Sequence, residues 1–189
     1  MANILQIAVD PPSETIELQA RLLIDGKDWL GPEVAGLDPD MLEAELLGKG
    51  IGRLLVGRCW CGIVGHNDVH VEVTRNRAYV HWSGAGGTIL GFVTARYDAE
   101  LARFARDKSW EPLERIVARQ VDQLFRGTGI RRGFEFDSAW ADRQEVHLLF
   151  RKSHHHKSLK FRWDGASLAD AINQARLFRA ERFSHCEPQ

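Results

Sequence analysis

The chain has 189 residues, of which 44% are hydrophobic and 27% charged, and its formal net charge at pH 7 is −1. This composition is typical of a folded globular protein and excludes a disordered chain, and the length suffices for one good hydrophobic core or two very small ones, of which we predict a single domain, residues 1–189. The near-neutral charge argues against a nucleic-acid or membrane-surface binder, so we expect neither nucleic acid nor a membrane among the partners.

The first part of the chain predicts short strands and one helix. Residues 2–9 form a short apolar run that ends at two prolines. Residues 15–26 alternate between apolar and polar side chains, as a half-buried strand does. Residues 36–50 predict a short helix, with Asp38 as its N-cap because an aspartate there can accept a backbone N–H of the first turn.

The stretch 69–83 predicts a β-hairpin, because apolar side chains occupy every second position in both of its halves. We expect Val73 to lie opposite Val80. Val71 then lies opposite Trp82, and all four side chains share one face of the sheet, which is the arrangement that burial favours.

The middle of the chain predicts a strand over 87–97 and then two helices. The first of these helices covers about 97–107 and is expected to begin at Asp98 as its N-cap. The second covers 109–125 with Ser109 as its N-cap, and its apolar residues recur with the period of an amphipathic helix.

The last third predicts three strands, over 133–140, 145–150 and 159–163, and a closing amphipathic helix capped by Ser167. The chain shows no regular alternation of strand and helix. We therefore predict an α+β fold with a mostly antiparallel sheet and about three to four helices packed on one face.

Several phrases between about residues 20 and 125 resemble an uncharacterised bacterial protein family. The stretch CWCGIVGH (59–66) corresponds to a CxCGxxGC-type motif of that family, and YDAEL (97–101) and SWEP (109–112) correspond to its helix pair. The resemblance implies a related fold and no known activity. His66 stands where relatives commonly carry a cysteine, and this exchange favours a metal over a redox role, since histidine can ligate a soft metal but cannot form a disulfide.

Cys59, Cys61 and His66 are the candidate metal ligands. Thiolates and imidazoles are the ligands that zinc prefers, and Gly62 and Gly65 would let the backbone wrap an ion. A fully extended CxC would hold its sulfur atoms too far apart, so the stretch must bend if it binds zinc. The alternative is that the cysteines are small buried hydrophobic residues and the histidine belongs to a turn.

The fourth ligand of such a site is open. The predicted hairpin directs His70 and His81 toward the solvent-exposed face of the sheet, away from the buried side. His185, Cys186 or a water molecule remain as candidates.

A second group of histidines, His154, His155 and His156, lies among basic residues in the stretch 151–160. These side chains could hold a metal ion or an anion. A solvated hairpin loop is the simpler interpretation, because adjacent residues of an extended segment point in different directions. We expect His147 to be a solvated or partly covered strand residue.

The sequence contains neither G-x-S-x-G nor H-E-x-x-H. We predict a non-enzymatic interaction or regulatory module that acts through an unidentified protein partner, with a homodimer as one form. The alternatives are a zinc-binding protein and a small enzyme whose site forms only in three dimensions. No leader or membrane-spanning stretch is recognised and the three cysteines do not form a disulfide framework, so we expect a cytoplasmic location.

Overall fold

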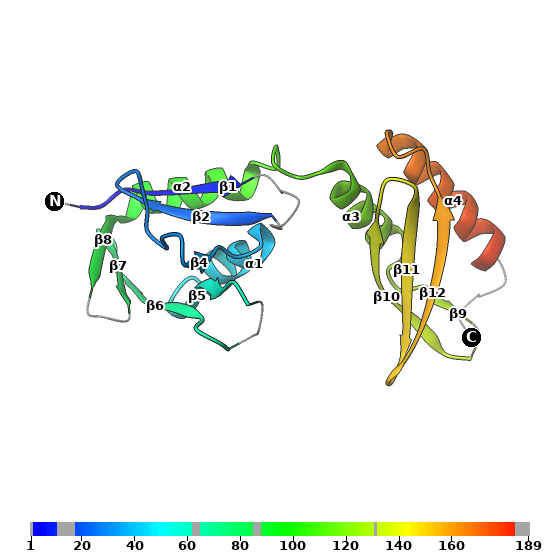
Figure 1. The fold of residues 1–189 in the computed structure, drawn as a ribbon, viewed down its shortest axis with the longest axis horizontal. Helices are drawn as coiled ribbons and strands as arrows, with labels where there is room; N and C mark the ends of the chain where they lie inside the picture. Colours follow the sequence, from blue (N-terminus) through cyan, green and yellow to red (C-terminus); the bar gives the residue numbers. More distant parts are fainter. Residues whose placement is uncertain (1, 11–17, 62–64, 85–87, 131, 184–189) are drawn as a thin grey trace. The chain divides into compact units, whose positions relative to one another are not determined.

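The chain folds into two compact units, unit 1 (Met1–Trp110) and unit 2 (Glu111–Gln189) (Figure 1). The structure, a computed structural model, describes residues 2–10, 18–61, 65–84, 88–130 and 132–183. This division differs from the single domain that was predicted. The physical reason is that buried apolar side chains of residues 5–104 form one core and those of residues 117–183 form another.

Unit 1 contains two antiparallel sheets. The first has the order β1-β2-β3 and is formed by Leu5–Asp10, Gln19–Ile24 and Lys27–Asp28. The second has the order β4-β5-β6-β7-β8 and is formed by Val34–Ala35, Gly52–Cys59, Val69–Arg75, Tyr79–Gly84 and Ile89–Val93. Its helical segments are α1 (Pro39–Glu43), the π-helical turn η1 (Ala44–Lys49) and α2 (Thr94–Arg106).

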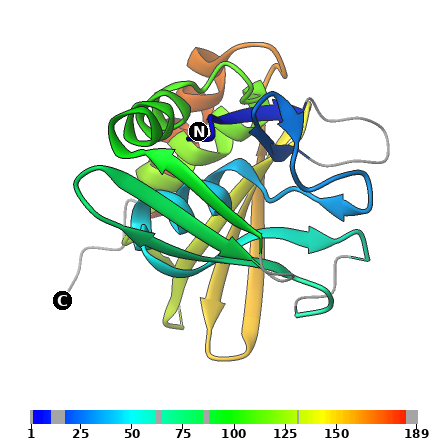
Figure 2. The ribbon, with the colours of Figure 1, turned by 90° about the vertical axis from the view of Figure 1, so that its left-hand side faces the viewer.

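Helix α2 lies beside the edge strand β1 (Figures 1 and 2). The carboxylate of Glu100 accepts the backbone N–H of Ile7 at 2.6 Å, and the guanidinium of Arg103 donates to the carbonyl of Ile7 at 2.6 Å. These contacts pair backbone groups that a neighbouring strand would otherwise have to satisfy. The helix therefore both covers the core and closes the edge of the first sheet.

Unit 2 is a four-stranded antiparallel sheet with two helices. The strand order is β12-β11-β10-β9, formed by His155–Arg162, Glu145–Lys152, Phe134–Ala141 and Gly129–Ile130. Helix α3 (Leu113–Phe125) precedes the sheet and α4 (Leu168–Phe183) follows it. Both helices pack on the face that carries the core, and the predicted α+β class is confirmed.

Two of the predicted helix starts are wrong. Helix α2 begins at Thr94, directly after β8, and Asp98 lies inside the helix, where it pairs with Arg75 at 2.8 Å. Helix α3 begins after Pro112, and Ser109 lies in the preceding turn. In both places contacts with other parts of unit 1 or the fixed φ of proline decide where the helix begins.

The β6–β7 hairpin has the predicted faces but not the predicted register. Val73 lies opposite Trp82 rather than opposite Val80. The cause is the turn, in which the side chain of Asn76 accepts the backbone N–H of Tyr79 at 2.9 Å and moves the pairing by two residues. A shift of two keeps each side chain on its face, so the valines and the tryptophan are still buried.

Tyr97 is the buried one of the two tyrosines, with 2% of its surface exposed. Burial disfavours the phenolate and raises the pKa of Tyr97 to about 12. An unfolded tyrosine ionises near about pH 10, so the stabilisation is complete below that pH. This stabilisation of the folded state is lost as the pH rises through about 12, and the loss amounts to about 3 kcal/mol in all.

We expect Tyr97→Phe to remove this alkaline loss of stability. Urea unfolding at a series of pH values should show the variant gaining about 2 kcal/mol relative to the native protein between pH 9 and pH 12. Near pH 7 the substitution should cost about 1 kcal/mol or less, because the Tyr97 hydroxyl makes no well-aligned hydrogen bond among the described residues and has only the indole of Trp82 as a polar side-chain neighbour. Tyr79→Phe, at an exposed position, is the control, and a Tyr97→Phe protein with the native pH profile would contradict the prediction.

Candidate metal centre

Cys59 is the last residue of β5, and the chain turns immediately after it. Trp60 and Cys61 form the turn, and the indole N–H of Trp60 fixes it by donating to the carbonyl oxygen of Pro32 at 3.0 Å. The bend predicted for the CxC stretch is therefore present. It brings the second thiol back toward the first.

His66 is carried by a second turn, just before β6. The carboxylate of Asp68 accepts the backbone N–H of Gly65 at 3.0 Å and so closes this turn. Gly65 and Asn67 have φ values of 82° and 52°, a left-handed conformation that glycine and asparagine adopt more readily than other residues. Asp68 is thus the residue that holds the backbone on which His66 is presented.

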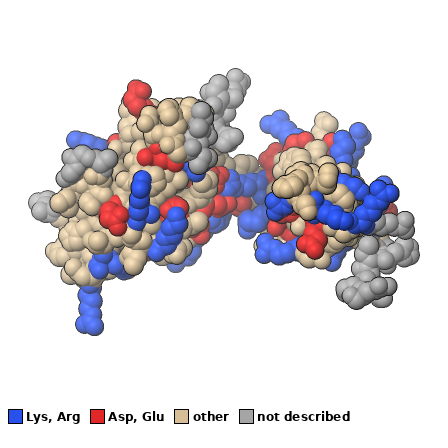
Figure 3. Space-filling model, turned by 90° about the horizontal axis from the view of Figure 1, so that it is seen from below, with Lys and Arg blue, Asp and Glu red and all other residues tan. Residues whose placement is uncertain are grey.

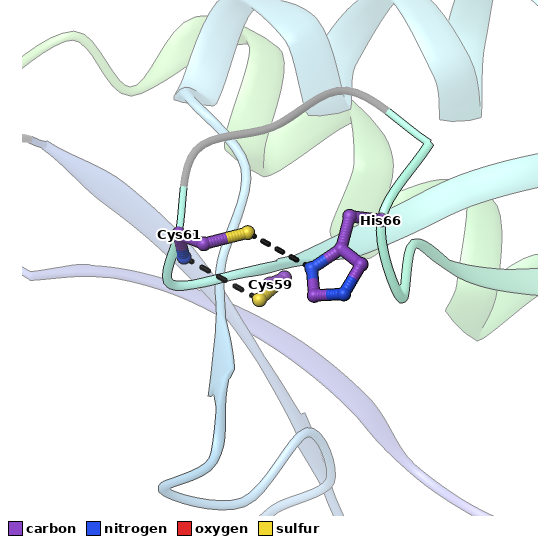
Figure 4. A group of neighbouring side chains, drawn as sticks. All are labelled: Cys59, Cys61 and His66. Atoms are coloured by element: carbon purple, nitrogen blue, oxygen red, sulfur yellow. Dashed lines mark hydrogen bonds between the residues drawn. The ribbon is translucent and has the colours of Figure 1, made fainter.

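The two turns bring Cys59, Cys61 and His66 together (Figure 4). Their ligand atoms all lie within 4.8 Å of one another. The sulfur of Cys61 lies 3.1 Å from Nδ1 of His66, and the backbone N–H of Cys61 donates to the sulfur of Cys59 at 3.4 Å. Cys59 is half-buried, whereas Cys61 and His66 are exposed, so the alternative of two buried cysteines in the core is wrong for Cys61.

These separations are close to those of a zinc site. Zinc lies about 2.3 Å from a thiolate sulfur and about 2.0–2.1 Å from an imidazole nitrogen, which places tetrahedral ligands about 3.4–3.8 Å apart. Ligation would therefore need shifts of about 1.4 Å or less from the separations of up to 4.8 Å. Rotation of exposed side chains can supply shifts of this size.

The electrostatic setting of Cys59 favours a bound cation. The hydrogen bond with the side chain of Cys61 raises the pKa of the Cys59 thiol, and the negative charge of Asp68 adds to this effect. The backbone N–H of Cys61 acts in the opposite direction. Two thiolates this close together repel each other, and a divalent cation between them removes that repulsion.

Two further histidines lie on neighbouring strands, and the sequence did not predict either of them as a ligand. His70 lies on β6 with its Nδ1 3.3 Å from the carbonyl oxygen of Asp68, and His81 lies on β7. Neither belongs to the three-residue ligand group found in the described part of the chain. His185 and Cys186 lie outside the described residues.

The histidines of the stretch 151–160 lie in unit 2. The predicted loop is shorter than expected, because β11 and β12 leave only Ser153 and His154 between them. His155 and His156 are exposed residues of β12, and consecutive strand residues point to opposite faces. These side chains form no metal-ligand group within the described ranges.

Sequence reasoning missed a cluster on the face of the unit 2 sheet opposite its helices. The ring of Trp140 stacks on His147, with centroids 4.7 Å apart and an angle of 2° between the planes. Nε2 of His147 lies 3.5 Å from the carboxylate of Asp142. Trp140 and His147 are cross-strand partners, so the pairing of β10 with β11 is the signal that would have identified them.

The face of each unit that Figure 3 shows carries mixed charge. Lys and Arg side chains are interspersed with Asp and Glu side chains in Figure 3.

A cavity of about 270 Å³ in unit 1 shares Asp68 with the turn of His66 and is also lined by Arg53, His70, Val71 and Glu72. Its lining therefore places one histidine, two carboxylates and one guanidinium beside the turn that carries His66.

No helix in the described ranges has both the length and the apolar character needed to cross a membrane. Comparison of the chain with protein-family models, with curated proteins and with solved structures gave no match. The resemblance over residues 20–125 therefore stays a prediction from the sequence. The geometry of Cys59, Cys61 and His66 is what remains to indicate a function.

Proposed function

We propose that the protein binds a divalent metal ion, with zinc as the natural occupant, through the sulfur atoms of Cys59 and Cys61 and the imidazole of His66. The observation that carries this proposal is the convergence of three ligand atoms to within 4.8 Å from two separate turns. Burial of apolar surface does not account for that convergence, because Cys61 and His66 are exposed.

The ligand types support zinc over the hard cations. Thiolate and imidazole are soft to intermediate ligands that suit zinc, whereas magnesium and calcium take oxygen ligands. His66, in the position where the resembling family commonly has a cysteine, keeps the number of ligands at three.

The three ligands found among the described residues leave one tetrahedral position, which we propose is taken by water or by a ligand from solution. The exposure of Cys61 and His66 makes that position accessible. Zinc sites with an open position bind and polarise a small ligand, whereas sites with four protein ligands are structural. We therefore infer an accessible centre rather than one whose purpose is to hold the fold together.

Elemental analysis of protein prepared without an affinity tag or added metal tests the proposal. We expect about one zinc per native chain and almost none in Cys59→Ser/Cys61→Ser, which loses both thiolate ligands. Arg77→Ala, at an exposed position, is the control that should keep the native zinc content, and Cys186→Ser tests whether the third thiol of the chain supplies the fourth ligand. Equal zinc in the native protein and the double variant, or zinc in neither, would contradict the proposal.

The wider predictions are compatible with such a centre. An interaction module with a protein partner, a homodimer and a cytoplasmic location each stay predictions. The small-enzyme alternative stays a prediction too. The metal centre is the stronger hypothesis, because its three ligand atoms lie within 4.8 Å of one another.

A further inference from the structure

We propose that Cys59 and Cys61 are also a site of reversible oxidation. A peroxide oxidises the two thiols to a disulfide, and the bound metal ion is released. This inference rests on the proposed metal function and makes occupancy of the centre depend on the redox state around the protein. It requires that the two thiols can meet, that an oxidant can reach them, and that the oxidised site holds metal poorly.

The two thiols can meet without disrupting the sheet. Their sulfur atoms already lie within 4.8 Å, and a disulfide bond has a length of about 2.05 Å. The strand β5 ends at Cys59, so Cys61 lies beyond the last paired residue and can move without breaking a strand pairing. The hydrogen bond from the Cys61 N–H to the Cys59 sulfur, at 3.4 Å, already folds the turn over the first thiol.

Cys61 is the thiol that the oxidant meets first, because it is exposed while Cys59 is half-buried. Its sulfur attacks one oxygen of hydrogen peroxide, the O–O bond breaks, and the hydroxide released takes up a proton and leaves as water. The product is a sulfenic acid on Cys61. The imidazole of His66, 3.1 Å from this sulfur, is a polar neighbour that can hydrogen-bond to the product.

Cys59 then completes the reaction. Its sulfur attacks the sulfur of Cys61, the S–O bond breaks, and the hydroxide released takes up a proton to give a second water. Two thiols and one peroxide thus become one disulfide and two waters, which is a two-electron oxidation of sulfur and a two-electron reduction of peroxide. A solution thiol reverses it by thiol–disulfide exchange.

The oxidised site has one metal ligand left. Disulfide sulfur carries no thiolate charge, and thiolate is the form in which cysteine binds zinc. Of the three members of the ligand group, only His66 keeps its ligating ability. A single exposed imidazole does not retain the ion, so disulfide formation and metal release are coupled.

The test uses full-length zinc-loaded protein, equimolar hydrogen peroxide and a chromophoric zinc indicator. We expect release of about one zinc per chain. We also expect the tryptic peptide 59–75, which contains Cys59 and Cys61 but not Cys186, to lose about 2 Da, the mass of two hydrogen atoms. Excess dithiothreitol should restore the peptide mass and zinc binding.

Metal-free protein, treated with hydrogen peroxide in the same way, separates this proposal from the proposed metal function. Cys59→Ser is the control, because it lacks the thiol that attacks the oxidised Cys61. In that variant the peptide should gain about 16 or 32 Da instead of losing about 2 Da. Native protein that binds zinc but forms no disulfide in 59–75, or keeps its zinc after forming one, overturns this inference and leaves the metal site standing. Protein that forms the disulfide but never binds zinc overturns the proposed function instead.

Discussion

Replacing Arg21 with alanine is expected to lower the free energy of unfolding of unit 1 by about 2–3 kcal/mol. Arg21 lies on β2 and is 8% exposed. Its guanidinium donates to the carbonyls of Val34 at 2.6 Å and Gly31 at 2.7 Å. It also pairs with the carboxylate of Asp28. The substitution removes the donor of two half-buried carbonyls and leaves space at a buried position of β2, and both effects destabilise the fold.

Hydrogen exchange measured by mass spectrometry checks this prediction. The amides of Gln19–Ile24 should lose protection by an amount that matches the predicted destabilisation, since their exchange reports opening of β2. Arg77→Ala is the matched control at an exposed position, with an expected change of less than about 0.5 kcal/mol. If Arg21→Ala and Arg77→Ala lowered the free energy of unfolding by the same amount, the predicted stabilisation by the buried guanidinium of Arg21 would be wrong.

Gly165→Ala is expected to destabilise unit 2 by about 2–5 kcal/mol, for two independent reasons. Gly165 has a φ of 72°, where a side chain costs about 1–2 kcal/mol. A Cβ atom there would lie 2.1 Å from the carbonyl oxygen of Arg143. That oxygen belongs to the backbone of the β10–β11 turn and cannot rotate away, so the turn or the start of α4 must move.

Gly127→Ala separates the two causes. Gly127 has a φ of 76°, yet a Cβ atom there would meet nothing within 4 Å. We therefore expect it to cost only the conformational part, about 1–2 kcal/mol. Hydrogen exchange of the β11 amides, Glu145–Lys152, measures the stability of unit 2 in both variants. If Gly165→Ala were as stable as Gly127→Ala or more stable, the predicted clash would be wrong.

Helix caps show where the sequence was sufficient and where it was not. The side chain of Asp38 accepts the N–H of Asp40 at 2.9 Å, and the hydroxyl of Ser167 accepts that of Asp170 at 3.3 Å, as both caps were predicted to do. Such contacts are local, so a short sequence window determines them. Asp98 was predicted as a cap in the same way, but its partner is Arg75, 23 residues away, and no local pattern contains that pairing.

The candidate site was predictable in its members and not in its geometry. The motif identified Cys59, Cys61 and His66 from residue type and spacing alone. Their convergence depends on the left-handed turn that Asp68 closes and on the anchoring of Trp60, both of which involve contacts outside the motif. The division into two units was also hidden, because no linker-like composition marks the boundary after residue 110.

The absorption spectrum of protein loaded with cobalt(II) tests the proposed centre most directly, because cobalt occupies tetrahedral zinc sites and its spectrum reports the ligands. We predict thiolate-to-cobalt charge-transfer bands together with intense ligand-field bands, saturating at about one cobalt per chain. Zinc should displace them, and Cys59→Ser/Cys61→Ser should lack them. A weak spectrum of the octahedral type that the cysteine substitutions leave unchanged would contradict a metal centre at Cys59, Cys61 and His66.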